Sequence, residues 1–185
     1  MQHVGPTSPG KLSRWVIPVV VLPGTVLVFV PLVIVWLTRG SGLAAILTGT
    51  RSIAFWLAIV LGVPGAVLSI WAMAMFFRFG NGTAAPWDPP QRLVVVGPYR
   101  HVRNPMLSGV IAMLMAESLL LQSWPLGIWA GVFFLANTVY FRLIEEPGLL
   151  TRFGDGYHVY CQHVNRWMPR LSPWQQPKDN ETASG

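Results

Sequence analysis

The sequence predicts an all-α integral membrane protein with about four transmembrane helices, including a C-terminal helical hairpin, and a cytoplasmic amphipathic helix. Of its 185 residues, 52% are hydrophobic and only 11% are charged, and the mean hydropathy is +0.48. Soluble domains carry about 25% charged residues, so this composition is typical of a membrane protein. Long uncharged runs indicate the same class, because a helix needs about 20 apolar residues to span a bilayer.

Two such runs predict the N-terminal part of the membrane domain. No charged residue occurs at positions 15–38 or 52–77, and each run is long enough for one span. We therefore expect residues 1–78 to form two transmembrane helices joined by a short outer loop at 39–51. The first run is too long and too rich in proline for a signal peptide.

The third apolar run predicts a helical hairpin. Residues 104–141 are too long for one span, and the sequence Trp-Pro-Leu-Gly at 124–127 interrupts them. Because proline cannot donate a helical hydrogen bond, we expect a turn there, with legs near 106–122 and 127–143. Each leg is at the short end of the spanning range, so a re-entrant hairpin is the alternative.

One charge, Glu117, lies inside this hairpin. Ionisable residues within spans are functional hypotheses by default. Glu117 lies near the outer end of its leg, however, and we expect a structural role, either protonated or paired with Arg39 or Arg51.

The basic residues predict the orientation. With four spans, eleven Lys and Arg residues fall on one side, and only Arg39 and Arg51 fall on the other. This bias places both termini in the cytoplasm, with the protein in the cytoplasmic membrane. The net charge of +6 then reflects topology and attraction to anionic lipid, not nucleic acid. The single cysteine, Cys161, excludes an intrachain disulfide, and no metal site is expected.

A basic stretch in the loop at 79–103 is the first candidate for chemistry. Leu93–Val96 is β-branched and is expected to be extended against the core. The following residues 97–107 read GPYRHVRNPML. Their basic side chains near a helix start predict an anion site, with Asn104 as N-cap and Pro105 in the first helical position. The alternative is ordinary anchoring of a span by basic residues.

The second candidate is the pair Glu145–Glu146 at the end of the last span. Two carboxylates at a helix C-terminus are disfavoured by the macrodipole, so a cation should offset them. Arg142, Arg100, Arg103 or a cationic ligand could do so. The alternative is a solvated pair that begins the next helix. We expect this pair and the basic stretch to form two halves of one pocket.

We expect residues 79–170 to form one functional unit that contains the loop, the hairpin and the segment after Glu146. Apolar residues within 147–169 recur with a helical period, which predicts an amphipathic helix on the membrane surface or against the loop. Gly154 and Gly156 should weaken it locally. Residues 171–185 are polar and are expected to form a disordered tail.

Taken together, these stretches resemble a known enzyme family. The order LV…GPYR..RNPM, a hydrophobic hairpin, and then EE…FG..Y..Y…V.R..P is similar to the isoprenylcysteine carboxyl methyltransferases, and the related phospholipid N-methyltransferases share a similar end. The resemblance covers about residues 91–170. It implies an integral membrane enzyme that binds S-adenosylmethionine at the cytoplasmic surface, in a site open laterally to lipid.

The resemblance also implies roles for individual residues. Arg142 would orient the acceptor, although it is offset by one residue from the family's arginine. Asn104 replaces the family's histidine, so it can still form hydrogen bonds but is a poor general base. Leu107 replaces the family's tyrosine, and the loss of this hydroxyl puts the family's exact substrate in doubt. Glu146 is the second catalytic candidate, not through the resemblance but as the base that an amine acceptor would need. The implied cofactor-binding residues are Gln91, Arg92, Leu93, Val94, Tyr99, Arg103, Asn104, Pro105, Met106, Leu107 and Glu145.

The expected acceptor is borne by a lipid or by a prenylated small molecule or protein. Through Arg142 the sequence favours a carboxylate. An amine is the alternative, and it would need a base such as Glu146 or His101. Two other classes stay open: an NADPH-dependent reductase of the sterol-reductase type, whose relatives carry more spans, and a non-catalytic membrane scaffold.

Overall fold

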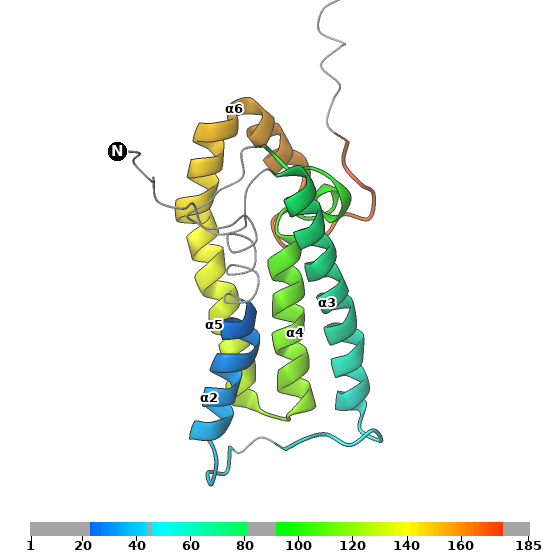
Figure 1. The fold of residues 1–185 in the computed structure, drawn as a ribbon, viewed down its shortest axis with the longest axis vertical. Coiled ribbons are helices and arrows are strands. Elements are labelled where there is room, and N and C mark those ends of the chain that lie inside the picture. Colours follow the sequence, from blue (N-terminus) through cyan, green and yellow to red (C-terminus); the bar gives the residue numbers. More distant parts are fainter. Residues whose placement is uncertain (1–22, 44–45, 81–91, 176–185) are drawn as a thin grey trace, which may run out of the picture.

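A computed structural model describes residues 23–43, 46–80 and 92–175, and all regular secondary structure within them is helical. Figure 1 shows long helices lying side by side, with the loop and the C-terminal part gathered at one end of the bundle. The predicted all-α fold is confirmed. The elements are η1 (Thr25–Phe29), α2 (Val30–Leu37), α3 (Ile53–Phe79), η2 (Gly97–Arg100), α4 (Pro105–Leu120), α5 (Trp124–Tyr140), η3 (Phe141–Glu145) and α6 (Glu146–His163).

Apolar helices account for the membrane domain. Within the described residues, α3 and the continuous run Trp124–His163 are long and apolar enough to span a bilayer, and α5 is the apolar part of that run. Thr25–Leu37 and α4 are apolar but shorter. Figure 1 shows α4 between α3 and α5, with successive segments running in opposite directions.

Small residues bring α3 and α4 into close contact. A side chain at Gly109 would collide with Ser69 and with the carbonyl oxygen of Gly65. The Ser69 hydroxyl donates a hydrogen bond to the Met106 carbonyl, at 2.9 Å. Small residues of this kind allow close approach of membrane helices. The contact fixes the N-terminal end of α4 against α3, and so fixes the residues that precede it.

The hairpin turn lies slightly earlier than predicted, at Leu121–Ser123. Trp124 begins α5, and Pro125 lies in its first turn, where a missing N–H breaks no helical bond. The Ser118 hydroxyl donates to the Ser123 carbonyl at 2.9 Å, and the Ser123 N–H donates to the Ser118 carbonyl at 3.0 Å. The proline therefore begins the second leg and does not form the turn itself.

The chain does not stop at Glu145–Glu146, which corrects the helix-terminus argument. It continues from α5 through the π-helical turn η3 into α6. Pro147 explains the wider turn, because it cannot donate to the preceding helical carbonyl. At Gly154 (φ 53°, ψ −133°) the backbone kinks and α6 folds back, as Figure 1 shows. The predicted amphipathic helix is thus two shorter pieces and ends at His163.

The segment Leu93–Val96 packs against the core, as its sequence predicted, and the structure adds a second packed layer on its other side. Val94 and Val96 pack on the α3 side, together with Ala72. Leu93 and Val95 pack on the opposite side, against the cluster around Tyr157, Tyr160, Val164 and Trp174. This alternation is the period-two pattern of extended backbone. It links the end of the helical bundle to α6.

The expected disorder does not begin at residue 171. Trp174 is only 8% exposed and packs against Tyr160 and His163. The backbone N–H of Trp174 donates to the Arg100 carbonyl at 3.0 Å, and Arg100 Nε donates to the Trp174 carbonyl at 2.7 Å. A large aromatic side chain buries enough surface to hold this segment on the loop. Residues 176–185 lie outside the described part of the chain.

Candidate active site

The two predicted halves of the pocket meet in an ion-pair network around Glu146. Arg103 Nη1 donates to Glu146 Oε1 at 2.8 Å. Arg166 donates through Nε to Oε1 at 2.9 Å and through Nη2 to Oε2 at 2.6 Å. This bidentate geometry is the strong form of a guanidinium–carboxylate pair. Glu146 therefore joins the loop, the beginning of α6 and the C-terminal segment.

Next to this network lie buried donors that have no partner. Arg103 Nη1 also donates to Cys161 Sγ at 2.8 Å, but Arg103 Nε has no hydrogen-bond partner. Asn104 Nδ2 is likewise buried and unpartnered. Asn104 occupies the N-cap position of α4, as expected, yet its side chain makes no capping hydrogen bond. Buried donors without partners are costly, and they mark places where a ligand acceptor would be favourable.

Glu145 differs from its neighbour because no described residue forms an ion pair with it. Its side chain is half-buried at the end of η3. Burial, together with the adjacent charge of Glu146, raises the pKa of Glu145 from 4.5 to about 7. Burial and the nearby Glu145 carboxylate also raise the pKa of Tyr99 above its ordinary value. The charge of Glu146 is therefore balanced by two arginines, whereas the Glu145 carboxylate would be stabilised by a bound cation.

This pKa predicts a pH dependence of stability. The folded state of the wild type binds an extra proton at Glu145 between pH 4.5 and about 7, so its free energy of unfolding falls across that window. Below pH 4.5 Glu145 is protonated in both the folded and the unfolded protein, so the free energy of unfolding does not change with its titration. Above about pH 7 Glu145 is ionised in both, and the decrease in the free energy of unfolding is complete. Relative to Glu145→Gln, the wild type should lose thermal stability from pH 4.5 to 7. A constant difference between their melting temperatures in detergent would contradict the raised pKa.

Tyr99 is fixed by a contact of its ring and by a hydrogen bond to its backbone carbonyl. It is buried on η2 and packs against Phe76 at 6.3 Å between ring centroids. The Tyr160 hydroxyl donates to the Tyr99 carbonyl at 2.6 Å. Gly97 begins η2 with φ +54°, a conformation that favours glycine, close to the side chains of Trp71 and Met75. The backbone around Tyr99 is therefore held independently of any ligand.

Replacing Tyr160 by phenylalanine tests this support. The Tyr99 carbonyl would lose a buried donor, which should lower the free energy of unfolding by about 1–3 kcal/mol. Thermal unfolding in detergent would measure the effect. His158→Ala, an exposed change on the same helix, is the control and should cost far less. Equal stability of wild type and Tyr160→Phe would show that the hydroxyl does not hold Tyr99.

The other residues implied by the resemblance lie around this centre at varying depth. Val94 and Pro105 are buried, and Leu93, Met106 and Leu107 are half-buried. Arg92 and Arg142 are exposed, and Gln91 lies outside the described residues. A separate hollow of about 380 Å³ opens between the loop and the C-terminal segment, lined by Val95, Val96, Gly97, Arg100, Trp174 and Gln175. Its lining does not include Glu145 or Asn104.

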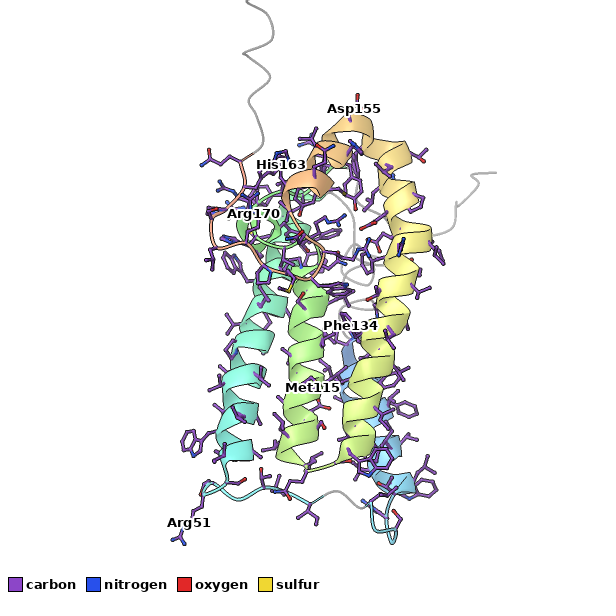
Figure 2. The ribbon with its side chains drawn as sticks, turned by 180° about the vertical axis from the view of Figure 1, so that it is seen from behind. Arg51, Met115, Phe134, Asp155, His163 and Arg170 are labelled. Carbon is purple, nitrogen blue, oxygen red and sulfur yellow. The ribbon has the colours of Figure 1, made fainter. Side chains whose placement is uncertain are left out.

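Sequence reasoning missed the contributions of the C-terminal segment. Arg166 was present in the quoted pattern V.R..P, but nothing in its spacing indicated a bidentate bond to Glu146. The role of Tyr160 was equally hidden, because its partner is a backbone carbonyl 61 positions earlier. Figure 2 shows His163 and Arg170 at the same end of the molecule as the loop, opposite Arg51. Proximity of this kind depends on the fold.

These features define a helical membrane protein whose charged and buried polar groups converge at one end of the bundle. Residues 53–156, just over half of the chain, match the family model of phospholipid methyltransferase. The protein therefore belongs to the phospholipid methyltransferase family, a family of membrane methyltransferases that act on lipid-type substrates. No curated protein and no solved structure matches the chain. The broader part of the predicted resemblance is confirmed.

The residues present fit the cofactor that this family uses. S-adenosylmethionine carries an anionic carboxylate and cationic ammonium and sulfonium groups. The unpartnered donors at Arg103 Nε and Asn104 Nδ2 suit the carboxylate. Within the described residues no cluster of histidine, cysteine or acidic side chains could hold a metal ion.

Proposed function

We propose that this protein transfers the methyl group of S-adenosylmethionine to an amine carried by a membrane lipid. The observation that supports an amine acceptor most directly is the unpaired, half-buried carboxylate of Glu145 beside the fully engaged Glu146. An ammonium group would supply the missing counter-charge. The position of Glu145 just beyond α5 suits a headgroup at the membrane surface.

Glu145 would bind the acceptor and take its proton. An amine is a nucleophile only after it loses a proton, and a carboxylate with a pKa of about 7 can hold that proton near neutrality. Glu146 suits this task less well, because its two oxygens already accept three hydrogen bonds from Arg103 and Arg166. We therefore assign the base to Glu145 and a positioning role to Glu146.

The loop and the start of α4 would bind the cofactor. S-adenosylmethionine supplies a methyl group already activated on a sulfonium centre, so the protein's task is alignment and exclusion of water. Arg103 and Asn104 would orient its carboxylate. The extended backbone at Leu93–Val94 and the ring of Tyr99 would bound the rest, as the resemblance implies.

A carboxylate acceptor is the second candidate, and Arg142 favours it. This residue is exposed one turn before Glu145, and its guanidinium makes no ion pair with any described residue. It could orient an acceptor carboxylate, as in isoprenylcysteine-type methylation, or equally the phosphate of a lipid headgroup. The support for the amine is stronger because Glu145 would repel a carboxylate.

Two measurements on detergent-purified protein test the proposal. Calorimetry should show micromolar binding of S-adenosylmethionine and none of NADPH. With a labelled methyl group, transfer to phosphatidylethanolamine in vesicles should then exceed transfer to a prenylated cysteine. Preference for the prenylated cysteine would favour the carboxylate reading. The methyltransferase assignment would be overturned if the folded protein bound NADPH, or if it bound neither S-adenosylmethionine nor NADPH.

A further inference from the structure

Glu117 lies in the opposite half of the membrane domain from the candidate active site. It is on α4, one turn before the helix ends at Leu120. The connection from α2 to α3 contacts this end, since the N–H groups of Ile46 and Thr48 donate to the carbonyls of Leu121 and Leu120. Glu117 is the only acidic side chain in the helices α2, α3, α4 and α5.

No cationic side chain neutralises this carboxylate in the described part of the protein. The ion pairs there both involve Glu146. The expected pairing with Arg39 or Arg51 is therefore not found. Figure 2 shows the Arg51 side chain extending away from the bundle. An isolated carboxylate in apolar surroundings is costly, so a cation from outside the protein would be bound favourably there.

An apolar groove between α3 and α4 begins at this carboxylate. Its volume is about 250 Å³. The small residues Gly62 and Ala116 let the two helices approach closely at its floor, and the exposed side chains of Ile59 and Val63 form its open edge. The complete lining is Ala58, Ile59, Gly62, Val63, Met113, Ala116, Glu117 and Leu120. Every lining side chain except Glu117 is apolar.

From this arrangement we propose that the groove binds a lipid with a primary amine in its headgroup. The ammonium group pairs with the Glu117 carboxylate, and part of one acyl chain lies along the apolar floor. A primary ammonium group can donate hydrogen bonds to the carboxylate, which a quaternary ammonium group cannot, and burial of apolar surface retains the chain. This site is separate from the site of methyl transfer, because Glu117 and Glu145 lie near opposite ends of the bundle.

Native mass spectrometry can test the groove independently of catalysis. The protein carrying Glu145→Gln, which neutralises the proposed acceptor carboxylate, is incubated with equal amounts of phosphatidylethanolamine and phosphatidylcholine. We expect bound phosphatidylethanolamine to exceed phosphatidylcholine by about threefold or more, because only its ammonium group can donate hydrogen bonds to Glu117. Adding Glu117→Gln to this protein should bring the ratio close to one.

Several results would overturn the proposal. One is the absence of amine preference in the Glu145→Gln protein, and another is its persistence after Glu117→Gln is added. A Glu117-dependent dimer in place of the lipid adduct would assign the groove to a second copy of the chain. Glu117→Ala and a thermal melt check that the loss is not caused by unfolding. Methyl transfer by the single Glu117→Gln variant should match that of the wild type.

Discussion

Glu145→Gln is expected to lower methyl transfer at least about 100-fold, the lower end of the effect of a general base. Glutamine keeps the size of the side chain but can neither balance an ammonium group nor take its proton. The wild-type rate should rise as the pH increases to about 7, where Glu145 ionises, and then level off. The residual rate of the variant should lack this rise. Initial rates with labelled S-adenosylmethionine across this pH range measure both effects.

The matched control for this experiment is Glu117→Gln. It makes the same chemical change at the other carboxylate near apolar helices, but at the far end of the bundle. Its transfer rate should be that of the wild type. A Glu145→Gln protein with the wild-type rate and pH profile would exclude Glu145 as the base. If Glu145→Gln abolished binding of S-adenosylmethionine, its carboxylate would act on the cofactor instead of the acceptor.

Glu146→Gln is expected to have the largest effect on stability, about 2–3 kcal/mol of unfolding free energy. Breaking one partner of a buried ion pair costs about 3–5 kcal/mol, and we reduce this because the three side chains are between 14% and 19% exposed. The amide cannot satisfy both guanidinium groups, so Arg103 and Arg166 would each lose their anchor. Urea or thermal unfolding in detergent measures the loss.

Asp155→Asn is the control for Glu146, since Asp155 is an exposed acid on the same helix, at the top of Figure 2. It should change the unfolding free energy by less than about 0.5 kcal/mol. Activity of Glu146→Gln should fall only as far as cofactor affinity falls. A variant with wild-type stability and no transfer at saturating cofactor would instead restore Glu146 as the catalytic base that the sequence first suggested.

The sequence was informative where one physical requirement dominates. Uncharged runs predicted the apolar helices, because the bilayer tolerates few charges. The β-branched run before Gly97 predicted extended backbone, and its alternation is visible in the two packed sides. The sequence was less informative at helix ends: Pro125 was expected to lie in the hairpin turn, but it lies in the first turn of α5. A proline alone does not tell a loop between two helices from the first turn of the second helix.

What the sequence determined by itself is the class of protein: an all-helical membrane protein with a basic loop and an acidic pair, in the order of a lipid-directed methyltransferase family. Only the tertiary structure decided how the two glutamates differ. Glu146 is neutralised because Arg103 and Arg166 reach it from segments 43 positions before and 20 positions after it. Glu145 is left without an ion pair among the described residues. The sequence cannot distinguish two adjacent glutamates. They differ in charge balance only because the fold places arginines from distant segments beside one of them.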